Sequence, residues 1–496
     1  MSLKETGISG VKWNTVASVN NAVIQTVKLM LLARLLTKSE LGIANLSLVV
    51  VGFTEIFANL GMNVGLIHKQ DITQKQYSSV FWLNLLLSVM LFGVLCLLSP
   101  LCAVIYHEPE LKTIIPVLGL LLPISAFGKM FYTFKTKELQ FKFISIVSLI
   151  SVEAGAVVTI VLAWWGWGAY SLVIGFLLQY FIMQSIYAIA GMKKYKILFY
   201  CKLKEIKDML KIGGFQVGTQ VMDFISSKID QLVIGFFGME ILGVYGLVKD
   251  LIHRILNTIN PIIVNVATPV FATFQKHLDL IQKRYLLLLK TILCIDFPIF
   301  MLLLLFPLPI SEILFGQNMS DAAPFTRLFA LMGLCISVSS PAGVLFVSLG
   351  RTDLSFIWTI IRLGMTTIAL SIASQISTFA IAWAQVIIAL VTVFLYWKVM
   401  IFPMSRIRFK DYMQIIARQL LYVVLSAIPC LYFAFIPLSK PLSLLFMTLY
   451  FICYILVLFI MDKKYMHEML QLVFPKIFKN KFKISCIFAN KKINDE

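Results

Sequence analysis

Two stretches of the chain carry polar side chains at helical spacing within otherwise apolar sequence. The first stretch contains Asn14, Ser18, Asn21, Gln25 and Lys28, and the second contains Gln216, Gln220, Asp223, Ser227 and Asp230. Steps of three and four residues place each set on one face of a helix. A polar face inside a membrane needs water or a polar ligand beside it, because polar groups in hydrocarbon cost free energy. The two stripes therefore predict helices that line a wet cavity.

Further cations occur inside apolar stretches. Lys249, Arg254 and Asn257 share one broad helical face, and Arg362 lies on a stripe of serine and threonine residues. Ammonium and guanidinium groups are common protein partners of phosphate and diphosphate. We therefore expect Lys28, Lys249, Arg254 and Arg362 to bind an anion.

Structural ion pairs are the alternative for each of these cations. Lys28 and Asp230 end the two stripes at equivalent positions, so they could pair with each other. Asp250 could neutralise Lys249 or Arg254, and Arg362 could pair with Glu153 or Asp296.

Three carboxylates are candidates for coupling transport to a proton or a sodium ion. Glu55, Asp223 and Asp230 lie at bilayer depth, where a carboxylate binds either cation. Each could instead serve only as the partner of a lysine.

Signatures of enzymes and of cofactor sites are missing from the sequence. It contains no phosphate-binding glycine loop, no G-x-S-x-G and no H-E-x-x-H motif, and no loop is large enough for a catalytic domain. The eight cysteines are scattered without ligand spacing, which predicts small core residues. We expect no enzymatic activity, no cofactor and no metal.

Composition identifies the fold class. The chain has 496 residues, of which 59% are hydrophobic and 14% charged, and apolar runs long enough to cross a bilayer recur throughout. We predict an all-α integral membrane protein with 14 spans, and with a first span that is not a cleaved signal. The spans are expected at 14–33, 41–66, 78–105, 113–134, 143–164, 168–190, 213–236, 241–271, 286–306, 323–349, 354–373, 379–399, 416–436 and 441–461.

The distribution of basic residues predicts the orientation. Of 43 lysines and arginines, the loops on one side hold only Arg34, Lys38, Lys112 and Lys440. Basic loops stay in the cytoplasm, so both termini are predicted there. The net charge of +19 thus reflects topology and contact with anionic lipids rather than nucleic acid.

Internal repetition predicts the domain organisation. The Leu-Gly-aliphatic turns at Gly42 and Gly243 are 201 residues apart, close to the separation of the two polar stripes. An even number of spans per repeat gives two parallel lobes. We predict an N-lobe over 1–200, a C-lobe over 201–400, two additional spans over 401–461 and a basic cytoplasmic tail over 462–496.

Several blocks of sequence resemble bacterial polysaccharide flippases of the multidrug/oligosaccharidyl-lipid/polysaccharide exporter superfamily. These blocks are RLLT at 34–37 with ELG at 40–42, ITQKQYSSVFWLN at 72–84, WGWGAYSLV at 165–173, DQLVIG at 230–235, LGVY at 242–245 and PVF at 269–271. The resemblance implies two six-helix lobes around a central cavity and transport by alternating access. It also implies a lipid-linked oligosaccharide, usually on undecaprenyl diphosphate, as cargo.

We therefore expect a flippase of the bacterial inner membrane, coupled to an ion and assisted by other polysaccharide-assembly membrane proteins. The four cations above would bind the diphosphate. The polar stripes would bind sugar hydroxyls through Asn14, Asn21, Gln25, Gln216, Gln220 and Asn257. Alternatives are a peptidoglycan-precursor flippase, a multidrug cation antiporter and a membrane scaffold that does not transport.

Overall fold

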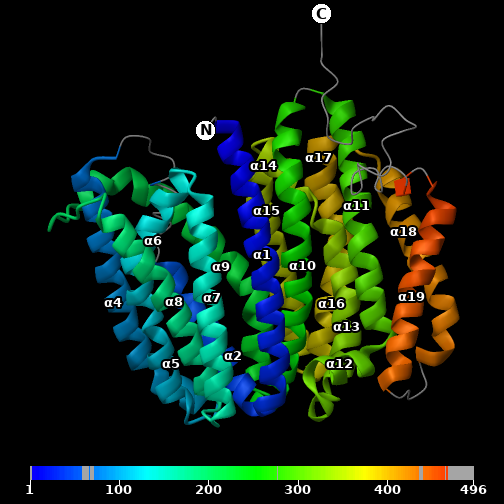
Figure 1. The fold of residues 1–496 in the computed structure, drawn as a ribbon, viewed down its shortest axis with the longest axis horizontal. Helices are drawn as coiled ribbons and strands as arrows, with labels where there is room; N and C mark the ends of the chain where they lie inside the picture. Colours follow the sequence, from blue (N-terminus) through cyan, green and yellow to red (C-terminus); the bar gives the residue numbers. More distant parts are fainter. Residues whose placement is uncertain are drawn as a thin grey trace, which may run out of the picture. The chain divides into compact units, whose positions relative to one another are not determined.

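The computed structural model describes residues 3–58, 66, 72–275, 277–434, 440–463 and 465–466, and all regular secondary structure in these ranges is helical (Figure 1). The helices are α1 (Leu3–Leu35), α2 (Lys38–Ala58), α4 (Gln74–Ile105), α5 (Leu111–Gly119), α6 (Leu121–Lys137), α7 (Phe141–Trp164), α8 (Ala169–Met192), η1 (Leu203–Ile206), α9 (Lys207–Gly235), α10 (Met239–Thr273), α11 (Leu278–Leu305), α12 (Pro307–Phe315), η2 (Gln317–Met319), α13 (Ala322–Ser339), α14 (Ala342–Ser348), α15 (Thr352–Ala373), α16 (Thr378–Tyr396), η3 (Trp397–Ile401), α17 (Phe402–Ser405), α18 (Phe409–Ala434) and α19 (Lys440–Met461). The predicted basic tail lies almost entirely outside the described residues.

The helices confirm the predicted fold class. Within the described ranges, thirteen helical segments are long and apolar enough to cross a membrane, so the chain is a multi-pass membrane protein. The span expected at 213–236 forms α9, which is long enough but is not among the thirteen. It contains several charged residues, among them Asp223, Lys228 and Asp230. The count of fourteen spans stays a prediction.

Two of the expected spans each consist of two helices. The span at 113–134 is divided at Leu120 between α5 and α6, and the span at 323–349 is divided at Ser340 between α13 and α14. Proline explains both breaks. Pro123 has no N–H to donate to the carbonyl of Gly119, and Pro341 disfavours helical backbone at Ser340.

The helices group into two compact units. The first comprises Met1–Thr258, Ser311–Phe325 and Phe356–Ile388, and the second comprises Ile259–Ile310, Thr326–Ser355 and Ala389–Glu496. In the first unit α7 packs against both α1 and α8, while α6 packs against α8 and α4 against α5 (Figure 1). The lobe boundaries at residues 200 and 400 stay a prediction.

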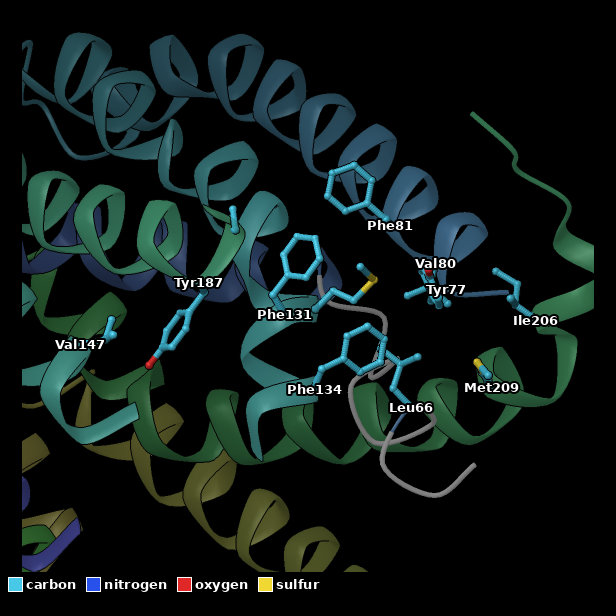
Figure 2. Packing of buried hydrophobic residues seen from close by; sticks show 12 residues of the cluster. Leu66, Tyr77, Val80, Phe81, Phe131, Phe134, Val147, Tyr187, Ile206 and Met209 are labelled. Carbon is cyan, nitrogen blue, oxygen red and sulfur yellow. The ribbon is translucent and has the colours of Figure 1, made fainter. Parts of the chain in front are cut away.

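A buried aromatic cluster holds α4, α6 and α8 together in the first unit. Figure 2 shows Tyr77 and Phe81 of α4, Phe131 and Phe134 of α6, and Tyr187 of α8. The rings of Tyr77 and Phe134 meet edge to face with centroids 5.8 Å apart, a favourable arrangement for aromatic pairs. These helices form a rigid support because their bulky side chains interlock.

Helices α2 and α10 approach each other closely at two glycines. A Cβ on Gly42 would lie 2.0 Å from the carbonyl oxygen of Met239, and a Cβ on Gly243 would lie 2.0 Å from that of Lys38. Lys38 and Met239 have the same separation in sequence as Gly42 and Gly243. Small residues allow helix backbones in membranes to come into contact. The same contact between a glycine and a backbone carbonyl therefore occurs twice at this crossing, once from each helix. This is expected if α2 and α10 are related by the internal repeat.

In the second unit α11 is fixed to the C-terminal helix. Lys290 Nζ lies 2.5 Å from Asp462 Oδ2, just beyond the end of α19. Pro298 cannot donate a backbone hydrogen bond to the carbonyl of Cys294, four residues earlier. The hydroxyl of Tyr454 donates to that carbonyl instead, at 2.8 Å. The bond satisfies a backbone acceptor and ties α19 to α11.

Candidate functional site: two cavities along α1

The first cavity, which we term the cationic cavity, has a volume of about 170 Å³ and lies within the first unit. Four helices, α1, α2, α8 and α10, supply its walls. The lining residues are Gln25, Lys28, Leu29, Leu32, Leu41, Ala44, Asn45, Leu48, Leu172, Phe176, Gly243, Leu247, Asp250 and Arg254. The end of the first polar stripe and a polar face of α10 therefore meet at this cavity.

Positive charge predominates in the cationic cavity. Lys28 is 9% exposed and shares the cavity with Arg254. The single carboxylate in the lining belongs to Asp250, which lies 3.8 Å from Lys228, a cation outside the lining. Lys28 has no ion-pair partner among the described residues, and Asp250 attracts Arg254 without forming an ion pair with it, so an anion or water in this small space would be favourable.

Two polar atoms of the cationic cavity have no hydrogen-bond partner in the described part of the chain. They are Arg254 Nε and Asn45 Oδ1, both buried. An unsatisfied buried polar group costs about 1–3 kcal/mol. A ligand with both acceptors and donors, such as a phosphorylated sugar, would satisfy them.

The second cavity, which we term the amide-lined cavity, has a volume of about 400 Å³ and lies farther toward the start of α1. Its walls come from α1, α2, α6, α7 and α8. The lining residues are Asn14, Ala17, Ser18, Asn21, Glu55, Lys129, Tyr132, Ile144, Ser145, Ser148, Tyr180, Met183, Gln184 and Tyr187. The polar stripe of α1 therefore lines both cavities: its first part, up to Asn21, lines the amide-lined cavity, and its last part, Gln25 and Lys28, lines the cationic cavity.

Hydrogen bonds already engage part of the amide-lined cavity. Asn21 Nδ2 donates to Ser148 Oγ at 2.9 Å, and Lys129 Nζ lies 3.3 Å from Glu55 Oε1. The side-chain oxygens of Asn21 and Gln184 are buried without a partner among the described residues. Amides and hydroxyls in this number suit a neutral polyhydroxylated ligand better than an anion.

The predicted pairing of Lys28 with Asp230 is replaced by another ion pair. Asp230 is fully buried, and Lys249 Nζ lies 2.7 Å from its Oδ1 and 2.6 Å from its Oδ2. The hydroxyl of Tyr245 donates to Oδ2 at 2.5 Å. Lys28 consequently remains available to the cationic cavity, whereas Lys249 is engaged by a carboxylate.

Most of the remaining charged candidates have other partners than those expected, although Asp250 also interacts electrostatically with Lys249 and Arg254, as the sequence analysis allowed. Asp250 pairs with Lys228, as noted above. Glu153 accepts a hydrogen bond from Asn20 Nδ2 at 3.1 Å, and Asp223 accepts one from Thr359 Oγ1 at 3.2 Å.

Four predicted ligands do not line either of the two cavities described here. Gln216, Gln220 and Arg362 are half-buried, and Asn257 is exposed. Their assignment as ligands stays a prediction.

Two lining residues of the cationic cavity escaped the sequence analysis. Asn45 is the one amide side chain in the apolar run at 41–53, which also contains Ser47, and an amide in such a run is the signal that could have identified it. A Cβ on Gly246 would lie 2.3 Å from Asn45 Nδ2, so a glycine of α10 makes room for this amide. Phe176 carries no such signal, because an aromatic residue in an apolar helix is ordinary.

The chain is similar in sequence to known proteins of polysaccharide biosynthesis. The chain is 27% identical over 392 residues to the teichuronic acid biosynthesis protein TuaB of Bacillus subtilis (strain 168), covering 77% of this chain and 80% of that protein. It is 25% identical over 414 residues to the lipopolysaccharide biosynthesis protein WzxC of Escherichia coli (strain K12), covering 83% of this chain and 84% of that protein.

The fold is also that of a solved transporter. The structure of the lipid II flippase MurJ in an inward closed conformation matches 91% of this chain and 99% of its own, with a TM-score of 0.73 and 16% identity. The model of the family described as "Polysaccharide biosynthesis protein" matches residues 31–324, more than half of the chain. This protein therefore belongs to the polysaccharide biosynthesis protein family.

Proposed function

We propose that the protein is a flippase that moves undecaprenyl-diphosphate-linked oligosaccharide units across the bacterial inner membrane by alternating access. The relatives named for teichuronic acid and lipopolysaccharide biosynthesis support a polysaccharide precursor as cargo. In this proposal the chain transports its cargo unchanged and catalyses no reaction. Both termini lie in the cytoplasm, which the bias of basic residues among the loops supports.

The observation that carries the proposal is the cationic cavity. Lys28 and Arg254 would bind the diphosphate, since both cations face a space that contains no unpaired carboxylate among the described residues. Gln25 and Asn45 would hydrogen-bond the first sugar. The polyprenyl tail would stay in lipid, because only the polar head needs shielding from hydrocarbon.

The size of the cationic cavity requires movement during transport. Its volume of about 170 Å³ is below the roughly 300–1,000 Å³ of typical ligand sites. A diphosphate with sugars fits only if the walls move apart. The described arrangement is thus a contracted state, and alternating access supplies the opening.

Ion coupling forms part of the proposal, with Glu55, Asp223 and Asp230 as the candidates drawn from the sequence. Glu55 is the most plausible of the three on geometry, since it lines the amide-lined cavity. Its ion pair with Lys129, at 3.3 Å, would have to open before the carboxylate takes up a cation.

The decisive experiment measures flipping in vesicles. Purified protein is reconstituted with a fluorescent undecaprenyl-diphosphate oligosaccharide, and the fraction reaching the opposite leaflet is followed with time. Wild-type protein is expected to flip the glycolipid. Arg254→Gln should weaken its binding by about 10- to 100-fold, because a hydrogen bond to a charged group contributes about 1.5–3 kcal/mol.

A matched control separates ligand binding from a general loss of charge. Arg351 pairs with Asp353 at 2.9 Å and does not line the cationic cavity, so Arg351→Gln should leave flipping unchanged. Equal flipping by Arg254→Gln and wild type at the same protein density would reject Arg254 as a ligand. Vesicles in which the wild-type protein flips no glycolipid would favour the scaffold alternative.

A further inference from the structure

Asp296 is a buried carboxyl group in the second unit that the proposed transport path does not use. It is 0% exposed and lies in α11 among buried apolar side chains that include Leu293 and Phe300. Neither of its side-chain oxygens has a hydrogen-bond partner of normal geometry in the described part of the chain. The neighbouring polar side chains are Ser337 of α13 and Asn260 of α10.

In the described part of the chain, the helices packed against α11 bring no free charge to Asp296. On α11 itself, Lys290 is paired with Asp462, which follows α19. Tyr454 of α19 donates to Cys294, two residues before Asp296 and therefore on a different face of α11. An unpaired ionised carboxylate in such surroundings would cost several kcal/mol.

Three further titratable groups on the helices around α11 lie elsewhere. Helix α18 runs in the same direction as α11, since Gln282 bonds to Ser405 near the start of both helices and Met301 lies with Ala427 near their ends. Arg418 is therefore nearer the start of α11, and Tyr422 lies beside Cys294, on a different face of α11 from Asp296. On α13, Arg327 lines a groove with Leu304 near the end of α11, more than two turns from Asp296. Beyond its neutral neighbours Asn260 and Ser337, Asp296 has no partner among these groups, so a ligand that is not a charged side chain has to remove its charge.

The balance of donors and acceptors identifies this ligand. Both oxygens of an ionised Asp296 are acceptors, and Asn260 Oδ1 is a further buried acceptor without a partner among the described residues. The Ser337 hydroxyl donates its hydrogen to the carbonyl of Gly333 at 2.9 Å. One proton on Asp296 removes the charge and creates an O–H donor for the neighbouring acceptor.

We propose that Asp296 is a proton-binding site, occupied in the described conformation, whose proton exchanges with water when the second unit changes conformation during transport. The step breaks only the O–H bond of the carboxylic acid: the proton passes to water, and the electron pair stays on the carboxylate. This inference deepens the proposed function, on which it rests, by naming the coupling ion and its site. The coupling site at Asp296 takes the place of Glu55, which was the preferred candidate among the three carboxylates selected from the sequence.

The first test detects the proton directly and does not require transport. Infrared spectra of the reconstituted protein should contain the C=O stretching band of a buried protonated carboxylic acid. Asp296→Asn should remove this band, whereas Asp353→Asn, at an exposed aspartate paired with Arg351, should retain it. An unchanged spectrum in Asp296→Asn would overturn the proposal.

The second test measures coupling in the vesicles used for flipping. A pH gradient should accelerate flipping by wild type and by Asp353→Asn, and it should not accelerate flipping by Asp296→Asn. Acceleration by a sodium gradient at constant pH, or an undiminished response of Asp296→Asn to the pH gradient, would contradict a proton site. Asp296→Glu retains the carboxyl group and should preserve part of the response, which tests the proposal even if Asp296→Asn folds poorly.

These experiments distinguish a failure of the proposed flippase function from a failure of the proposed proton site at Asp296. If the wild-type protein flips no glycolipid, the proposed function is wrong, while the infrared band still tests Asp296. If the wild type flips glycolipid at a rate that no pH gradient alters, the flippase assignment stands and the coupling role of Asp296 is wrong.

Discussion

Replacing Gly243 with alanine would place a methyl group against the carbonyl oxygen of Lys38. The added Cβ would lie 2.0 Å from that oxygen, whereas ordinary van der Waals contact begins at 3.4 Å. Because the obstacle is backbone, it cannot rotate away as a side chain would. Helices α2 and α10 would have to separate by about 1.4 Å at the crossing, the difference between these two distances.

The free-energy cost follows from two opposing effects. Overpacking of a close contact costs roughly 1–3 kcal/mol, while alanine gains about 1 kcal/mol over glycine in helix propensity. The expected net result is destabilisation by up to about 2 kcal/mol. Gly243 also lines the cationic cavity, so the separation should slow flipping of the glycolipid as well.

Thermal unfolding of the detergent-solubilised protein measures the effect. The matched control is Gly93→Ala in α4, where a new Cβ would have no atom within 4 Å. The control should be neutral or stabilised by roughly 0.5–1 kcal/mol, since glycine within a helix is unfavourable. Gly42→Ala, which makes the equivalent contact with Met239, should behave like Gly243→Ala.

A specific pattern of unfolding temperatures would contradict the close approach of α2 and α10. If Gly243→Ala and Gly42→Ala unfold at the same temperature as Gly93→Ala, the backbones of α2 and α10 do not touch at these glycines. A loss of stability in all three variants would instead indicate a general effect of alanine, unrelated to the crossing.

Three further predictions concern a buried ion pair, an amide without a partner and a half-buried carboxylate. Lys249→Met should destabilise the protein by about 3–5 kcal/mol, because it leaves Asp230 buried and unpaired, and adding Asp230→Asn should recover most of this loss in the same unfolding assay. Asn45→Ala should leave the melting temperature nearly unchanged, since Asn45 Oδ1 has no partner in the described structure, yet it should weaken glycolipid binding by about 2- to 10-fold, measured by titration. Burial disfavours ionisation of Glu138, but hydrogen bonds from Lys194, at 2.5 Å, and from a tyrosine hydroxyl lower its pKa below the ordinary 4.5. The stabilisation of the fold by ionised Glu138 is therefore complete above pH 4.5 and is lost as the pH falls through the lowered pKa. Glu138→Gln should therefore have a lower melting temperature than wild type at pH 7 and the same melting temperature in acid.

Much of the architecture follows from local properties of the chain. Apolar runs and their polar faces predict where helices form, because backbone groups in lipid must be satisfied within the segment. The same reasoning missed the breaks at Leu120 and Ser340, although Pro123 and Pro341 were visible. The polar stripe of α1 was predicted correctly as a cavity wall, whereas its division between two cavities depends on which helices pack against it.

Sequence alone determined that the chain is a multi-pass helical membrane protein with cations inside its spans, since hydropathy and periodicity are properties of consecutive residues. Only the tertiary structure decided which of those cations are free to bind a ligand. Lys28 and Lys249 look equivalent in sequence, yet Lys28 lines the cationic cavity while Lys249 is held by Asp230. The physical reason is that the pairing of buried charges depends on distances of a few ångströms between helices, and those distances are set by side-chain packing.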